Sequence, residues 1–151
     1  MKRYLAATAL VAAALTPAAA SAAGKTKAFK QSGIGATYNP GGSTPTLVIF
    51  VRFTDPTFGP GVAVLTASGP ANATTLTGKG TEYFAGATIK VTTTYTIGAV
   101  NSATMTLPVT GTGKLTGGTG KAKGITGKFT FAAGEQTSNL NFTISLKGTR
   151  T

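Results

Sequence analysis

The feature that most constrains the fold is a strict alternation of apolar and polar residues over short segments that end in turn residues. Residues 139–147 show it best, with asparagine, threonine, serine and lysine between the apolar positions Leu140, Phe142, Ile144 and Leu146. Successive side chains of a β-strand point to opposite faces, so this period of two predicts a strand with one buried face. Glycine (21 residues) and threonine are abundant, and both suit turns and strands better than helices. The sequence therefore predicts an all-β fold.

Further segments repeat the pattern, some of them loosely. They are 29–38, 46–54, 62–67, 76–84, 88–97 and 105–115. The residues that follow Gly127 alternate too, so seven or eight strands are expected. Short strands, brief turns and no amphipathic helix predict a sandwich or a barrel, and periodicity alone does not choose between them.

The segment 46–54 is apolar on both of its faces. Its alternate positions include Ile49 and Val51 on one face and Val48 and Phe50 on the other. A strand of this kind is usually covered on both sides. In a single-layer barrel the cover must be an extra segment or a second subunit, so a homo-oligomer, a dimer or a trimer, is expected.

The chain begins with the features of a secretory signal peptide, which we assign to residues 1–22. Two basic residues precede a short apolar run, and small residues stand before the expected cleavage point after Ala22. A membrane anchor is the alternative, but the apolar run is short for a bilayer span. No later segment is long and apolar enough to span one. The mature protein is therefore expected outside the cell, in the periplasm or in the cell envelope.

The mature chain is strongly basic. Without Lys2 and Arg3 it has 12 basic and 3 acidic residues, a net charge of +9. Three lysines fall in 23–30, which is expected to be a basic arm or simply a frayed terminus. Residues 31–151 form the predicted barrel domain.

The stretch 111–127 is interpreted as a tight β-hairpin with glycine-rich turn residues. Its motif residues are Gly117, Gly118, Thr119, Gly120, Gly124 and Gly127, with Lys121 between them. This segment resembles one found in allene oxide cyclase and dirigent-like barrels, which include many small secreted bacterial proteins. The chain departs from that pattern at Ala122, where the family usually has an aromatic residue, and at Lys123 and Ile125.

The resemblance covers about a tenth of the chain by motif, and glycine- and threonine-rich hairpins also occur elsewhere. It implies a single antiparallel eight-stranded β-barrel, often trimeric. It also implies a protein that guides the cyclisation or coupling of a reactive intermediate. Such chemistry depends on confinement more than on strong acids and bases.

Composition limits the available chemistry. The chain has no histidine and no cysteine, and its carboxylates are Asp55, Glu82 and Glu135. Catalytic triads and zinc sites lack their usual residues, and three isolated carboxylates are poor material for calcium. No nucleotide-binding fingerprint is present. We therefore expect no metal and no cofactor, and catalysis is left open but not favoured.

Four residues are weak catalytic candidates. Glu82 is in phase with Leu76 and Phe84, so it either points into the barrel, with a raised pKa, or ends its strand in solvent. Arg52 either pairs with it or lies on the outer face. Tyr83 and Tyr95 are possible hydrogen-bond donors. A register slip of one residue reverses each assignment.

The second group of candidates is basic, and the hairpin model brings it together at one end of the domain. It consists of Lys114, Lys121, Lys123 and Lys128. Such a tip would contact an anionic surface, or it would serve only solubility. Nucleic acid is not favoured, because stacking aromatics are absent between Thr110 and Lys128.

Three functions remain open. The first is a non-enzymatic binding module for a small apolar or amphipathic ligand or for an anionic envelope surface. The second is the cyclase- or dirigent-like role, and the third is a structural or adhesive envelope protein. An open apolar lumen would favour the small ligand.

Overall fold

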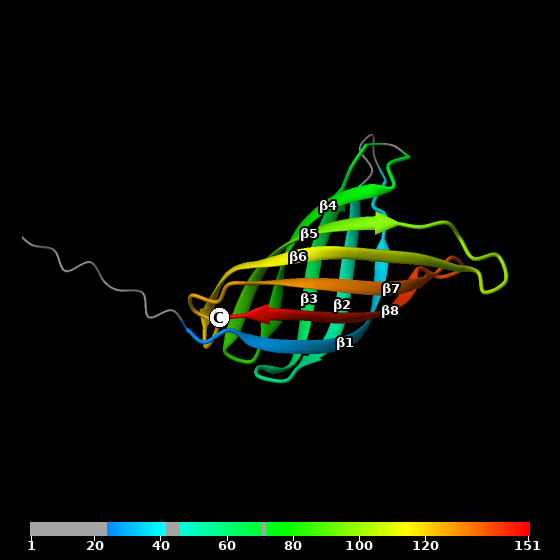
Figure 1. Ribbon diagram of the computed structural model, residues 1–151. Coiled ribbons are helices and arrows are strands. Elements are labelled where there is room, and N and C mark those ends of the chain that lie inside the picture. The colour runs from blue at the N-terminus through cyan, green and yellow to red at the C-terminus, as the bar shows by residue number, and fades with distance from the viewer. Residues whose placement is uncertain (1–23, 42–45, 71) are drawn as a thin grey trace, which may run out of the picture.

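A computed structural model describes residues 24–41, 46–70 and 72–151, and the predicted signal peptide lies outside this part (Figure 1). The described residues form eight strands. These are β1 (Lys27–Tyr38), β2 (Thr46–Asp55), β3 (Gly59–Ser68), β4 (Thr75–Phe84), β5 (Ala87–Ile97), β6 (Thr106–Gly120), β7 (Gly127–Gln136) and β8 (Asn141–Arg150). Within these ranges no helix is long and apolar enough to cross a membrane.

The strands form one closed antiparallel barrel in which each strand pairs with the next along the chain. Closure comes from β1 and β8, which pair from Lys27 with Arg150 to Ala36 with Asn141. The expected all-β class and the single antiparallel eight-stranded barrel are confirmed. Closure also removes the unpaired edges that an open sheet would expose.

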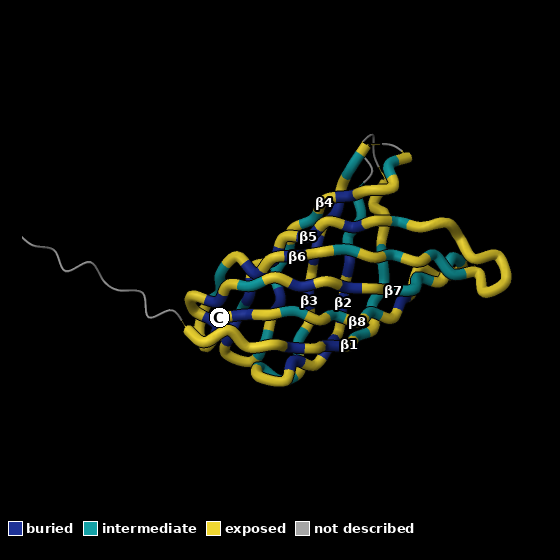
Figure 2. Tube along the Cα trace, viewed as in Figure 1, coloured by how far each residue is buried: buried dark blue, intermediate teal, exposed yellow. Residues whose placement is uncertain are grey.

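Inward and outward positions alternate along each strand, as Figure 2 shows by burial. In β8, Phe142 is buried and Thr143 is exposed, as expected. Leu140 is a correction, because it precedes the strand, has a φ of 57° and is 38% exposed. The alternation in the sequence therefore continues one position into the turn.

Large inward side chains lie over inward glycines of the neighbouring strand. Phe129 pairs with Gly113 on one side and with Gly148 on the other. A Cβ atom built on either glycine would overlap Phe129. A barrel of eight strands has room for side chains and little more. The glycines therefore make the space that the aromatic rings occupy.

The two ends of the barrel differ. At the end that carries both described termini, the loop between β6 and β7 folds inward and buries Ala122 and Ile125. We call this the closed end. At the opposite end, the inward residues Leu47, Ile97 and Leu107 are only partly buried (Figure 2). We call this the open end.

Two boundaries differ from those expected. Strand β1 begins at Lys27, and Phe29 is buried, so residues 27–30 belong to the barrel and not to a separate arm. The hairpin turn is later than expected, because residues 117–120 form the end of β6 and the turn follows at 121–126. The register between β5 and β6 shifts at this point. Lys90 pairs with Gly117 and Val91 pairs with Leu115, so Thr116 of β6 is an extra residue that forms a β-bulge.

The outer face of β2 is uncovered by any described segment. Phe50 is 49% exposed and lies beside Val64 of β3 and Ala36 of β1. Ile34 and Tyr83 extend this apolar outer patch over β1 to β4. The cover that the sequence predicted is thus not part of the described chain, and a second subunit stays a prediction.

Candidate functional site

The lumen of the barrel contains a cavity of about 110 Å³. Its wall is mainly aliphatic and aromatic, with Phe129, Phe131 and Phe142 among its rings. The polar residues that line it are Gln31, Thr37, Glu82, Thr93, Tyr95 and Glu135. Small-molecule sites typically combine an apolar wall with a few polar groups. The lumen is therefore the candidate functional site.

Glu82 supplies a carboxyl group to this cavity. It lies on β4 between Ala63 of β3 and Ile89 of β5, and it is 7% exposed. Burial raises its pKa from the ordinary 4.5 to about 7, with a further increase from the charge of Asp55 and a partial offset from Arg150. Within the described ranges no hydrogen bond holds this carboxyl group. It is therefore able both to donate and to accept a proton near neutral pH.

Asp55 and Arg150 form a buried ion pair at the closed end. Arg150 donates from Nη1 to Oδ2 at 2.6 Å and from Nη2 to Oδ1 at 3.0 Å, a two-point contact. Gln31 donates a further hydrogen bond to Oδ2. The backbone N–H groups of Thr57 and Phe58 donate to Oδ1 at 2.7 and 2.9 Å. All the acceptor positions of the carboxylate are used, so this group is structural.

The pKa of Asp55 lies below its usual value. Burial by itself would raise the pKa, but the hydrogen bonds from Arg150, Phe58, Thr57 and Gln31 outweigh it. The guanidinium group lies 4.8 Å from the ring centre of Phe29 and 5.1 Å from that of Phe58. These two rings cover the ion pair and add cation–π attraction.

Thr93 and Tyr95 face the lumen from β5. The Thr93 hydroxyl is buried and makes no hydrogen bond of good geometry within the described ranges, although it lies close enough to the Tyr95 phenol to offset part of the rise in the pKa of Tyr95. A buried hydroxyl without a partner costs roughly 1–3 kcal/mol, so it favours any ligand atom that would bond to it. Burial raises the pKa of Tyr95, which keeps this phenol neutral. Its ring packs edge-on against Phe131 at a centroid distance of 5.2 Å.

The open end holds one polar contact across the lumen wall. The Thr37 hydroxyl donates to Oε2 of Glu135 at 2.7 Å. Leu47, Ile97 and Leu107 surround this end and are partly exposed. A ligand that enters here meets an apolar opening first and reaches Glu82 deeper in the barrel.

The other catalytic candidates lie outside the lumen. Arg52 and Tyr83 are on the outer face, where Tyr83 is 48% exposed. The possible pair of Arg52 with Glu82 is therefore wrong, and the alternative, in which Arg52 lies on the outer face, is confirmed. Of the four candidates, the structure brings Glu82 and Tyr95 to one cavity.

The four hairpin lysines are exposed but do not form one tip. Lys114 and Lys128 lie directly opposite each other on β6 and β7, while Lys121 and Lys123 are in the loop between these strands. The expected cluster is thus two separate pairs. Of the two pairs, only the strand pair lies on the barrel wall.

The glycine motif serves packing and backbone geometry. A Cβ atom on Gly118 would lie 2.5 Å from the carbonyl oxygens of Thr88 and Ala122. Gly120 and Gly124 have φ values of 57° and 80°, which favour glycine. Thr119 is 2.7 Å from Thr88 between their hydroxyl oxygens. Ala122 is 2% exposed, so there is no room at this point for the aromatic residue of the resembling family.

Sequence reasoning missed several inward polar residues, among them four whose phase gave a signal. Arg150 follows Phe142, Ile144 and Leu146 at even spacing in β8. Gln31 and Thr93 are likewise in phase with Phe29 and with Tyr95. Asp55 is in phase with the buried face of β2, but the chain there reads as the start of a loop. Within the described ranges no group of three or more acidic, histidine or cysteine side chains is placed to hold a metal ion.

The fold and the cavity together define a closed eight-stranded antiparallel barrel with a small, mostly apolar lumen. Glu82 is the one buried acid in this lumen that has no hydrogen bond or ion pair with a described residue. A comparison of the chain with models of known families, with curated proteins and with solved structures finds no match. The functional conclusion therefore depends on the geometry of the lumen.

Proposed function

We propose that this barrel binds a small amphipathic molecule in its lumen, with the polar group of the ligand near Glu82 and its apolar part toward the open end. The observation that carries the proposal is an apolar cavity whose wall holds two polar groups, the Glu82 carboxyl group and the Thr93 hydroxyl, that make no hydrogen bond of good geometry to any described residue. Buried polar groups are nearly always hydrogen-bonded, so unpaired ones in a cavity point to a ligand.

The size of the cavity limits the ligand. An apolar cavity of roughly 150 Å³ is large enough for benzene, so about 110 Å³ admits a small ring or a short alkyl group. A longer molecule would have to extend through the open end past Leu47 and Ile97. The partly exposed apolar residues there support such an extension.

Titration with 1-hexanol, hexanoic acid and hexylamine tests this proposal, with backbone amide chemical shifts as the readout. Residues of the lumen wall should shift and those of the outer face should not. Ala63→Leu fills space beside Glu82 and should weaken binding, whereas Val64→Leu, on the outer face of the same strand, should leave it unchanged. Equal effects of the two changes, or no shifts with any probe, would exclude a lumen site.

A second candidate is the guidance of cyclisation or coupling of a reactive intermediate, as the resemblance implies. The observation in its favour is Glu82, whose pKa of about 7 suits proton transfer near neutral pH. Native mass spectrometry of protein from its own host separates the candidates. An unchanged bound molecule supports binding alone, whereas a molecule that only Glu82→Gln protein retains supports conversion by the wild type.

A further inference from the structure

The outer surface has an unusual charge distribution. Asp55, Glu82 and Glu135 all occupy inward positions. Among the described residues eleven basic side chains are exposed, namely Lys25, Lys27, Lys30, Arg52, Lys79, Lys90, Lys114, Lys121, Lys123, Lys128 and Lys147. On the part of the surface that the structure describes, no acidic side chain is placed to neutralise them.

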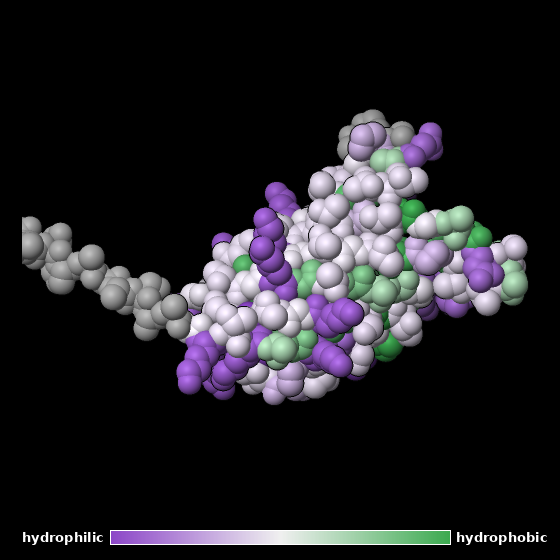
Figure 3. Space-filling model, in the orientation of Figure 1, coloured by the Kyte–Doolittle hydropathy of each residue, from purple (hydrophilic) through white to green (hydrophobic). Residues whose placement is uncertain are grey.

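Five of these lysines form a line across the strands, which we call the lysine stripe. Its members are Lys79 of β4, Lys114 of β6, Lys128 of β7, Lys147 of β8 and Lys30 of β1. Strand pairing places Thr92 of β5 between Lys79 and Lys114. Between β7 and β8 the line shifts by two residues, because Lys128 lies opposite Thr149 and Lys147 lies opposite Thr130. At about 4.8 Å between strands, the part from β4 to β8 spans roughly 19 Å. Figure 3 shows hydrophilic side chains that project from a mostly pale surface.

The lysine stripe contains two like-charge pairs in direct register. Lys114 lies opposite Lys128, and Lys147 lies opposite Lys30. Like charges directly opposite each other in a sheet are destabilising. These neighbours also lie within the screening length of about 8 Å at physiological ionic strength, so their charges act together. A bound polyanion would remove this repulsion.

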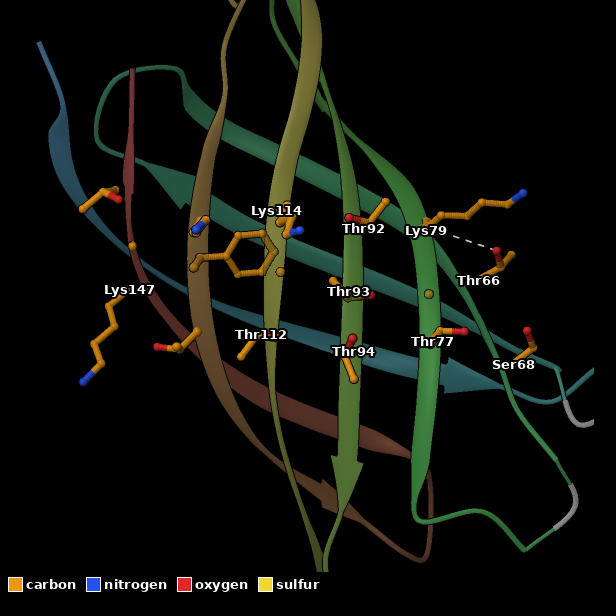
Figure 4. Close-up of a pocket in the computed structure, with 17 residues that line it drawn as sticks. Thr66, Ser68, Thr77, Lys79, Thr92, Thr93, Thr94, Thr112, Lys114 and Lys147 are labelled. Atoms are coloured by element: carbon orange, nitrogen blue, oxygen red, sulfur yellow. Dashed lines mark hydrogen bonds between the residues drawn. The ribbon is translucent and has the colours of Figure 1, made fainter.

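The four lysines from β4 to β8 also border a shallow groove of about 880 Å³, shown in Figure 4. Between them the outward positions are almost all hydroxyl side chains. These are Thr66, Ser68, Thr77, Thr92, Thr94, Thr112, Thr130 and Thr149. Apart from Thr66, which donates to the Lys79 carbonyl at 3.4 Å, no hydrogen bond to a described protein group occupies these hydroxyls. The groove thus offers ammonium groups together with free hydroxyls.

We propose that this groove is a binding site for a linear anionic polysaccharide with carboxylate groups, which would run across β4 to β8. The ammonium groups match the carboxylates, and the threonine and serine hydroxyls match the sugar hydroxyls. Nucleic acid fits less well because none of the groove's outward side chains is aromatic and able to stack on bases. A membrane fits less well because the groove carries no outward apolar side chain to insert into lipid.

Calorimetric titration with a polygalacturonate oligomer tests the site. The variant K79Q/K114Q/K128Q/K147Q should lose at least about tenfold in affinity. The matched variant K25Q/K27Q/K121Q/K123Q has the same net charge but keeps the lysine stripe, so it should bind almost as the wild type does. Equal losses in the two variants would show that only total charge matters and would overturn the proposal.

A second pair of measurements tests the hydroxyls and the kind of polymer. Thr92→Val with Thr112→Val keeps the shape of the strands, and it should weaken binding without changing its dependence on salt. Neutral dextran should not bind, and oligothymidine and vesicles with anionic phospholipid should bind more weakly than polygalacturonate. Tighter binding of either competitor, or no polygalacturonate binding at low ionic strength, would overturn the proposal.

Discussion

Replacement of Glu82 by glutamine should change how stability depends on pH. Glutamine has nearly the shape of the protonated acid but cannot ionise. The folded protein raises the pKa of Glu82 from 4.5 to about 7, mainly through burial. Between these values the unfolded chain releases a proton that the folded chain keeps. The stability of the wild type should therefore fall as the pH rises from about 4.5 to about 7, and should level off above that.

The expected size of this effect follows from the two pKa values. At about 1.4 kcal/mol for each pH unit, their difference corresponds to about 3 kcal/mol. Glu82→Gln should thus match the wild type near pH 4.5 and exceed it by up to about 3 kcal/mol at pH 8. The chain has no histidine and no cysteine, the other side chains that commonly titrate in this range.

Urea unfolding from pH 4.5 to pH 8.5 measures the effect, with Glu82→Leu as a second variant that also lacks the titrating group. Both variants should lose the slope, whatever their absolute stabilities. The lowered pKa of Asp55 affects stability in a lower pH range. Its stabilising contribution is lost only as the pH falls below the ordinary pKa of 3.8. A wild type with equal stability at pH 5 and pH 8 would refute the buried position of Glu82, as would a slope that persists in both variants.

Three further predictions concern stability and assembly. Phe142→Ala should lower the free energy of unfolding by about 3 kcal/mol or more, because it leaves a cavity in the core. Thr143→Ala, on the outer face, should lower it by well under 1 kcal/mol. Similar losses for the two variants in urea unfolding would contradict the register of β8. Arg150→Met should lower the free energy of unfolding by about 3–5 kcal/mol in the same assay, because it leaves the Asp55 carboxylate buried without its partner. An unchanged stability would show that water already solvates the ion pair. If the apolar outer patch is the expected subunit contact, Phe50→Lys should convert an oligomer to a monomer in light scattering, and a wild type that is already monomeric at micromolar concentration would exclude this contact.

The periodicity of the sequence was sufficient for the strands with one polar face. In β8 it placed Phe142 inside and Thr143 outside, because burial of one face makes a register slip costly. In β2 the periodicity did not show which face points into the barrel. Both faces of this strand are apolar, so the sequence favours neither orientation. The sequence therefore left two positions open for Arg52, in the lumen or on the outer face, and the structure has it on the outer face.

The polar centre of the closed end was harder to predict. Asp55 and Arg150 are 95 positions apart, and they meet only because closure brings the end of β8 beside β1 and opposite the end of β2. No local signal reports such a distance. The position of the turn after β6 was also predicted wrongly. Residues 117–120 have the composition of a turn, but they belong to β6, and their small size allows close packing within the strand.

The position of Thr151 next to Gly24, the first described residue, has a practical consequence for orientation. Gly24 and Thr151 lie side by side at the closed end, where a Cβ atom on Gly24 would be 3.9 Å from the carbonyl carbon of Thr151. A linker attached at Thr151 would therefore hold the barrel with its open end pointing away from the support. Protein immobilised in this way on a sensor surface would present the lumen to the analyte in every copy.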